Sequence, residues 1–319
     1  MNAAWLHPLI MIAAALAGLG LGTAFGLDDS ASWAIEPFLV IMLFSVFLAV
    51  DFGDMRRSFD NRSFFASAVI INFVWTPVLA YVLGLAFFDG SLDMRIGLIM
   101  LLVTPCTDWY LVFTSVAKGN VPMSSSLLPI NLILQILLLP VYIKVFAGED
   151  SSFDMLGMFL DMWIVLIPFA AAFILKAASG RNNSARSVVD GLNSRSDGIQ
   201  LAFLCMAIAV MFAAESTELF DNFDVLLESL MPLAIFFAVN YCVSTAVYRA
   251  QNYPYADGTS LIFTTLARNS PLALAIAVMA FPDRPLIMLV LVIGPLIELP
   301  ILSLVASLRL RGNDAQNAG

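Results

Sequence analysis

The segment Leu98–Tyr110, which reads LIMLLVTPCTDWY, decides how this chain folds. It starts as an apolar run typical of a membrane-spanning helix, and Pro105 then interrupts it beside Cys106 and Asp108. Proline removes a helical hydrogen bond, and its ring clashes with the preceding turn. The segment therefore predicts a span that is broken near the middle of the membrane, where freed backbone groups can bind a solute.

A second segment, Thr264–Pro271, repeats this pattern with the sequence TTLARNSP. It also places a proline next to a polar cluster inside an apolar run, and it occupies the matching place in the second half of the chain. We expect these two broken spans, the fourth and the ninth, to carry the residues that bind the solute.

The composition predicts that most of the protein surface faces lipid. Of the 319 residues, 61% are hydrophobic and 12% are charged, and the mean hydropathy is +0.91. Soluble domains carry roughly 25% charged residues. We therefore predict an all-α membrane protein whose main partner is the lipid bilayer, with no nucleic-acid partner.

The use of histidine and cysteine argues against several classes of site. His7 is the single histidine, and Cys106, Cys205 and Cys242 lie in separate apolar runs. This pattern favours neither a zinc site nor a disulfide framework, and it offers no histidine for acid–base catalysis. We expect no cofactor and no catalytic residues, so the chain is not predicted to be an enzyme.

Ten segments have the length and apolar character of membrane-spanning helices, which need about 20 mostly apolar residues. The ten segments are Pro8–Phe25, Ile35–Ala49, Phe64–Phe88, Ile96–Val116, Leu127–Phe146, Met155–Leu175, Ile199–Ala214, Val225–Val247, Ser260–Phe281 and Pro285–Leu308. They predict a transporter-like protein of ten transmembrane helices.

The distribution of basic residues predicts the orientation of these spans, because Lys and Arg gather in cytoplasmic loops. With a cytoplasmic N-terminus, eleven of the 15 basic residues lie inside, three lie outside and Arg268 lies within a span. The three outside residues are Arg95, Lys144 and Arg284. This bias predicts a multi-pass protein of the plasma (inner) membrane with both termini in the cytoplasm.

The polar connection Lys176–Asp197 divides the chain into two halves of five spans each. An odd number of spans per half gives the halves opposite orientations, as in transporters with inverted repeats. Asn72 and Asn240, 168 positions apart, are a weak sequence echo of such a repeat. We predict one membrane domain over residues 1–319, inverted repeats at about 1–150 and 151–312, and a short polar tail at 313–319.

Three ionisable residues, Asp108, Arg268 and Glu298, lie inside predicted spans. An intramembrane charge costs roughly 2.5–3.5 kcal/mol, so such residues are normally paired or functional. Asp108 and Arg268 either flank the solute and relay a proton or form a structural ion pair between crossing helices. Glu298 is either a protonatable carboxyl that couples transport to the proton gradient or a partner in a hydrogen bond between helices.

Uncharged polar residues complete the candidate site. Cys106 is either a small packing residue or a soft ligand for a metalloid, and Asn269 is a candidate for binding the solute. Other polar residues within spans either line a cavity or form hydrogen bonds between helices, which is the commoner role in membranes. These residues are Thr104, Thr107, Asn72, Asn131, Asn240 and Ser270.

Motifs in spans four, five, nine and ten resemble one known group of transporters. They are Pro105–Trp109, Ala117–Asn120, Pro129–Leu132, Leu274–Ala277 and Gly294–Pro300. Together they resemble the bile acid:sodium symporter superfamily, and within it the arsenite-exporting permease branch more than the bile-acid branch. The resemblance implies ten spans in a panel domain and a core domain, with broken spans four and nine crossing in the core.

The same resemblance implies a function for individual residues. It implies secondary active export of arsenite in exchange for protons, with Cys106 as the metalloid-contacting thiol and Glu298 as the coupling carboxyl. Span nine departs from the branch, because Ser270–Ala273 replaces the usual Asn-Asn-Phe-Glu-type run.

Sodium coupling is a separate question. The bile-acid branch uses an acidic residue of span nine for sodium, whereas this chain has Arg268-Asn269, and a fixed cation is a poor neighbour for Na⁺. An alternative is a Na⁺- or H⁺-coupled symporter of a small organic anion that Arg268 selects.

Overall fold

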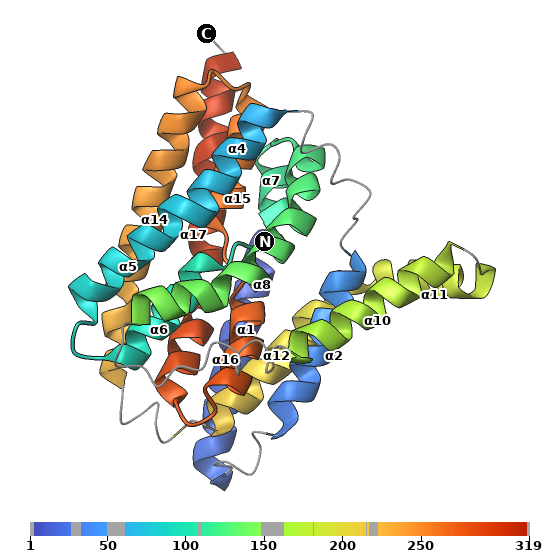
Figure 1. Cartoon of the computed structure of the whole chain (residues 1–319), viewed down its shortest axis with the longest axis vertical. Coiled ribbons are helices and arrows are strands. Elements are labelled where there is room, and N and C mark those ends of the chain that lie inside the picture. The colour runs from blue at the N-terminus through green and yellow to red at the C-terminus, as the bar shows by residue number, and fades with distance from the viewer. Residues whose placement is uncertain are drawn as a thin grey trace.

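The computed structural model describes residues 3–26, 33–49, 61–107, 110–147, 163–180, 182–214, 216 and 223–317. Nearly all of these residues are helical, and the described ranges contain no β-strand beyond one isolated bridge (Figure 1). The prediction of an all-α protein is therefore confirmed for this part of the chain.

The helices follow one another along the chain with short connections. They are α1 (Ala3–Phe25), α2 (Ile35–Ala49), α4 (Arg62–Ile70), the π-helical turn η3 (Ile71–Trp75), α5 (Thr76–Phe87), α6 (Leu92–Val103), α7 (Tyr110–Val116), α8 (Val121–Ala147), α10 (Trp163–Ser179), α11 (Asn183–Asn193), α12 (Ser196–Ala214), α14 (Phe223–Ala250), α15 (Tyr255–Leu266), α16 (Ser270–Ala280) and α17 (Pro285–Asn317).

Several helices satisfy the length and composition needed to cross a bilayer. Four do so alone: Arg62–Phe87, Val121–Phe146, Leu227–Ala250 and Pro285–Arg311. A fifth is obtained if Asn183–Asn193 and Gly198–Ala214, which meet at a 60° bend, count as one span. Large apolar side chains such as Val78, Phe173 and Leu304 are exposed on the outer faces of helices, as lipid contact requires. The chain is a multi-pass membrane protein, and the number of ten spans stays a prediction.

The predicted spans and the observed helices agree closely in position. Wherever the structure describes them, the ten predicted segments coincide with a helix or with consecutive helices, and Ile35–Ala49 has the bounds of α2. The connection Lys176–Asp197 contains the helix α11, and α17 continues to Asn317, into the segment that was predicted as a polar tail.

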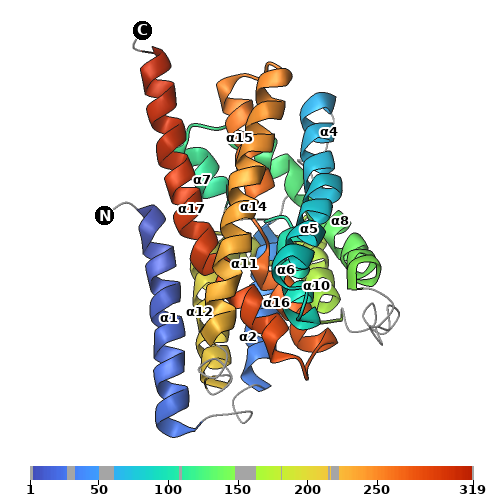
Figure 2. The ribbon, with the colours of Figure 1, turned by 90° about the vertical axis from the view of Figure 1, so that its left-hand side faces the viewer.

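The helices pack as two groups that meet at the broken spans. In one group α1 packs on α12, and α2 packs on both α12 and α10. Figure 2 shows α1 and α12 running side by side. Gly18 and Gly22 of α1 face the backbone of Ala209 and Ala213 in α12, so the absence of side chains there permits the close approach. In the other group α6 packs on α5, α8 and α17, and α14 packs on α15 and α17.

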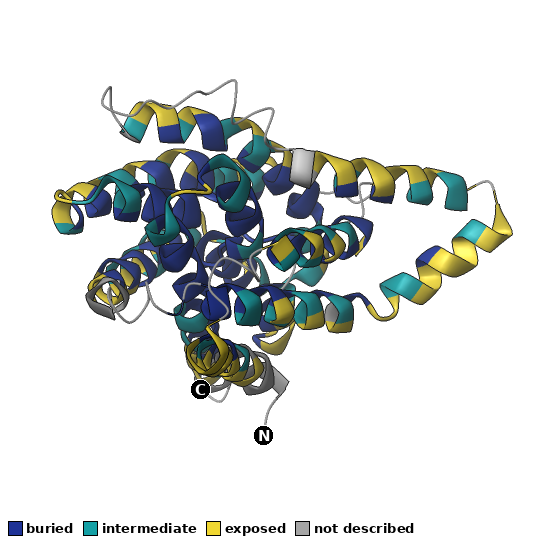
Figure 3. Cartoon of the chain, turned by 90° about the horizontal axis from the view of Figure 1, so that it is seen from below, coloured by how far each residue is buried: buried dark blue, intermediate teal, exposed yellow. Residues whose placement is uncertain are grey.

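Two helix interruptions cross at the centre of the protein. The first separates α6 from α7 and the second, at Ala267–Asn269, separates α15 from α16. Pro105 and Arg268 form an isolated antiparallel bridge, with hydrogen bonds from Cys106 N to Ala267 O (3.0 Å) and from Asn269 N to Thr104 O (2.7 Å). The most deeply buried residues surround this crossing (Figure 3). The predicted breaks in spans four and nine are thus present, and each interruption binds the other.

Candidate functional site

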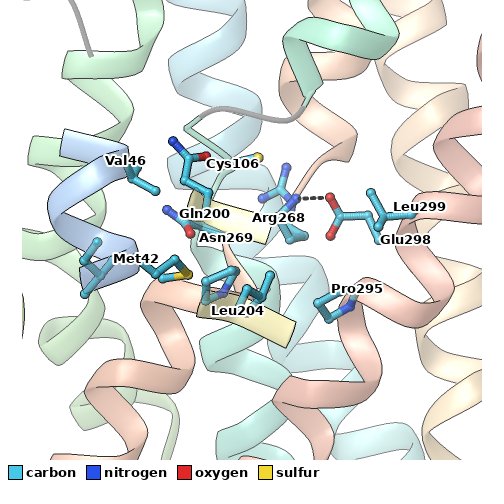
Figure 4. A pocket seen from close by; sticks show the side chains of 12 residues that line it. Met42, Val46, Cys106, Gln200, Leu204, Arg268, Asn269, Pro295, Glu298 and Leu299 are labelled. Atoms are coloured by element: carbon cyan, nitrogen blue, oxygen red, sulfur yellow. Dashed lines mark hydrogen bonds between the residues drawn. The ribbon is translucent and has the colours of Figure 1, made fainter. Parts of the chain in front are cut away.

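A small cavity of about 30 Å³ lies beside the crossing (Figure 4). Its walls come from α2, α12, both helix interruptions and α17. The lining residues are Met42, Leu43, Val46, Cys106, Gln200, Leu204, Arg268, Asn269, Pro271, Pro295, Glu298 and Leu299. A volume of this size holds one or two water molecules, so the cavity suits a small inorganic solute better than a large organic one.

Four of the predicted site residues meet at this cavity: Cys106, Arg268, Asn269 and Glu298. Cys106 follows Pro105 in the non-helical stretch after α6, where Thr104 has an extended backbone (φ −103°, ψ 97°). The proline therefore places the thiol on the cavity instead of on a continuous helix face. Cys106 is 5% exposed.

The crossing redirects backbone N–H groups that would otherwise complete the two helices. In continuous helices, Cys106 N and Asn269 N would donate to Leu102 O and Thr265 O, four residues earlier. They donate instead to the opposite interruption. Leu102 O and Thr265 O therefore need other donors, because a buried carbonyl without one is costly.

The guanidinium of Arg268 supplies most of those donors. Its Nη1 donates to Leu102 O (2.8 Å), its Nε donates to Leu266 O (3.2 Å) and its Nη2 donates to Thr265 O. A cation at the C-terminal ends of two helices also interacts favourably with their dipoles. The guanidinium carbon lies 5.3 Å from the ring centre of Phe236, in cation–π contact. Arg268, which is 3% exposed, thus stabilises the crossing that it belongs to.

Asn72 and Asn240 complete the same interruption from two other helices. Asn72 Nδ2 donates to Thr264 O (3.2 Å), and Asn72 Oδ1 accepts from Arg268 Nη2 (3.0 Å). Asn240 Nδ2 donates to Thr265 O (2.8 Å), and Asn240 Oδ1 accepts from the indole of Trp75 (3.0 Å). Neither asparagine is among the residues that line the cavity. Both form hydrogen bonds between helices, which is the other role that the sequence left open.

Glu298 and Asn269 fix the beginning of α16 and the exposed end of the interruption. Glu298 Oε1 accepts from the backbone N–H of Arg268 (3.0 Å), and the side chain is 5% exposed. Asn269 caps α16, because its Oδ1 accepts from Leu272 N (3.3 Å). Its Nδ2 donates to Thr107 Oγ1 (3.2 Å). Glu298 therefore touches both the cavity and the backbone of the broken helix.

The remaining predicted residues lie elsewhere or outside the described part of the chain. Thr104 and Thr107 are buried within the crossing, and neither lines the cavity. Ser270 Oγ and both amide atoms of Asn131 are buried with no hydrogen-bond partner in the described part of the protein. Asp108 lies outside the described residues, as does its predicted pairing with Arg268.

The sequence analysis missed one polar residue of the cavity, Gln200. It lies on α12, one helical turn before Leu204, and is 2% exposed. Its position next to the predicted start of a span gave it the look of an interfacial residue. Within the described ranges, no three His, Cys, Asp or Glu side chains gather where they could hold a metal ion.

Comparison with known proteins gives a family match and two similar proteins. Residues 36–222 match the family described as Sodium Bile acid symporter family. The chain is 22% identical over 319 residues to the Arsenical-resistance protein Acr3 of Corynebacterium glutamicum, covering 92% of this chain and 85% of that protein. It is 23% identical over 255 residues to the Uncharacterized protein YbaS of Bacillus subtilis, covering 79% of this chain and 81% of that protein.

Proposed function

The chain belongs to the Sodium Bile acid symporter family, and from this premise we propose that it is a secondary active transporter that exports arsenite in exchange for protons. The observation that carries the proposal is the position of the Cys106 thiol on one small cavity with Glu298 and Asn269. The similarity to a protein named for arsenical resistance over 92% of the chain supports the same solute.

The proposed chemistry follows from the two reactive side chains of the cavity. A cysteine sulfur is a soft ligand that suits a metalloid, so Cys106 contacts arsenite directly. A buried carboxyl can gain and lose a proton within the physiological range, so Glu298 carries the exchanged proton. The cavity volume of about 30 Å³ fits a small inorganic acid. Organic ligands of drug size occupy roughly 300–1,000 Å³.

The proposed architecture is that of ten spans in two inverted five-helix repeats, with both termini in the cytoplasm of a plasma (inner) membrane. The interruptions in spans four and nine, in matching places of the two halves, support the repeat. The group formed by α1, α2, α10 and α12 would be the panel, and the group around the crossing would be the core. Movement of one group against the other would open the cavity to each side in turn.

The proposal is tested by arsenite accumulation in everted membrane vesicles that contain the protein. We expect saturable accumulation that a protonophore abolishes. Cys106→Ser keeps a similar volume and removes the soft ligand, so it should abolish accumulation while the protein remains folded and inserted. Arsenite accumulation that Cys106→Ser leaves unchanged would show that the thiol has no role in transport.

A second candidate function is a Na⁺- or H⁺-coupled symporter of a small organic anion. The observation that favours it is the location of Arg268 on the cavity. Against it, the guanidinium already donates four hydrogen bonds to protein acceptors, which leaves one of its five N–H groups for an anion. This alternative predicts anion uptake that requires a Na⁺ or H⁺ gradient, and uptake that is insensitive to both gradients would exclude it.

A further inference from the structure

Gln200 is a buried amide whose oxygen has no donor in the described part of the protein. The residue is 2% exposed, and no described group donates to its Oε1. Buried acceptors are almost always satisfied, and leaving one unpaired costs free energy. The side chain lines the cavity beside the crossing, so a molecule in that cavity is the natural source of the missing donor.

The neighbouring amide of the cavity is already engaged. Asn269 Nδ2 donates to Thr107, and Asn269 Oδ1 accepts from the backbone of Leu272. Figure 4 shows Gln200 and Asn269 on the side of the cavity that lies away from Glu298. Of the two amides, Gln200 therefore offers an acceptor to a solute, and Asn269 serves the fold.

The chemistry of the lining indicates which solutes can enter. Most of the lining side chains are apolar, including Met42, Leu204 and Leu299. The acceptor of Gln200 and the carboxyl of Glu298 both disfavour negatively charged oxygens, and that repulsion is strong where water is scarce. A neutral solute that carries hydroxyl groups avoids this repulsion and supplies the hydrogen-bond donor.

We propose that Gln200 Oε1 accepts a hydrogen bond from a hydroxyl group of the transported solute and thereby selects small uncharged hydroxylated acids over oxyanions. The inference rests on the proposed function, since arsenite in neutral water is an uncharged acid with three hydroxyl groups. Gln200 belongs to the group formed by α1, α2, α10 and α12, whereas Cys106 and Glu298 lie at the crossing and on α17. The bound solute thus contacts both groups of helices.

The test measures the KM and the maximal rate of arsenite uptake by everted vesicles that contain each variant. Gln200→Met keeps the length of the side chain and removes the acceptor, so the KM should rise roughly two- to tenfold with little change in maximal rate. Gln200→Glu retains an acceptor oxygen and should keep the KM within about threefold of the wild type. Gln135→Met is the matched control, because Gln135 is also fully buried but does not line the cavity.

The selectivity is tested with arsenate, an oxyanion, as a competitor of arsenite uptake by the wild type. We expect no competition at a tenfold excess of arsenate. The inference about Gln200 is wrong if Gln200→Met has the KM of the wild type, if Gln200→Met and Gln200→Glu are impaired equally, or if arsenate competes. In those cases arsenite export by the wild type still stands. A wild type that takes up no arsenite would instead refute the proposed function, and the inference with it.

Discussion

The guanidinium of Arg268 should be the largest single contributor to the stability of the crossing. Arg268→Met tests this, because methionine has a similar unbranched side chain but donates no hydrogen bond. In the variant, Leu102 O and Asn72 Oδ1 lose the donors that Arg268 gives them. The C-terminal ends of α6 and α15 would also face each other without a cation between them.

The magnitude follows from the four hydrogen bonds of the guanidinium. Hydrogen bonds to a charged group contribute about 1.5–3 kcal/mol each, so four contribute about 6–12 kcal/mol when they are treated as independent. An intramembrane cation costs roughly 2.5–3.5 kcal/mol, which the variant recovers. The net effect of Arg268→Met is therefore a loss of at least about 3 kcal/mol.

Thermal unfolding of the purified protein in detergent measures the effect. A loss of at least about 3 kcal/mol corresponds to a decrease in Tm of roughly 5 °C or more. The matched control is Arg284→Met, since Arg284 is 34% exposed and pairs with Asp93 at 3.1 Å. A half-exposed pair of this kind contributes about 0–1 kcal/mol. The reasoning is refuted if Arg268→Met unfolds at the temperature of the wild type, or if the control is equally destabilising.

Three further predictions concern coupling and packing. Glu298→Gln keeps an acceptor oxygen for the broken helix but cannot carry a proton, so arsenite transport in vesicles should stop responding to a pH gradient while the Tm stays unchanged. Gly18→Val should lower the Tm, at a cost of about 1–3 kcal/mol, because its side chain would meet a carbonyl of α12; Gly20→Val, with nothing within 4 Å, is the control. Asn240→Leu removes the donor to Thr265 O and should destabilise the protein by about 1–3 kcal/mol in the same assay.

The helices and their interruptions were predictable from the sequence because both depend on local properties. Apolar length sets where a span can lie, and a proline beside polar residues sets where it breaks. Leu98–Tyr110 and Thr264–Pro271 carry both signals, and the structure interrupts both helices. The meeting of Cys106 and Glu298 at one cavity was predicted in part, through their places in broken or proline-containing spans.

The partners of the asparagines could not be predicted, because they depend on the crossing. Asn72 and Asn240 were recognised as an echo across the two halves, and each donates to a carbonyl of α15, to Thr264 O and Thr265 O respectively. Those carbonyls need outside donors because N–H groups after them bind elsewhere. That rearrangement is a property of the packed protein. Gln200 was missed for a similar reason, since its burial comes from helices distant in sequence.

The charge between the ends of α6 and α15 is covalently attached to the chain. A diffusible ion in the position of the Arg268 guanidinium would have to be taken from solution, and the stability of the crossing would then vary with the concentration of that ion. Because the chain carries this cation itself, the crossing should keep the same shape in sodium-free and sodium-rich media. The positions of Cys106 and Glu298 are thereby independent of the salt composition on either side of the membrane.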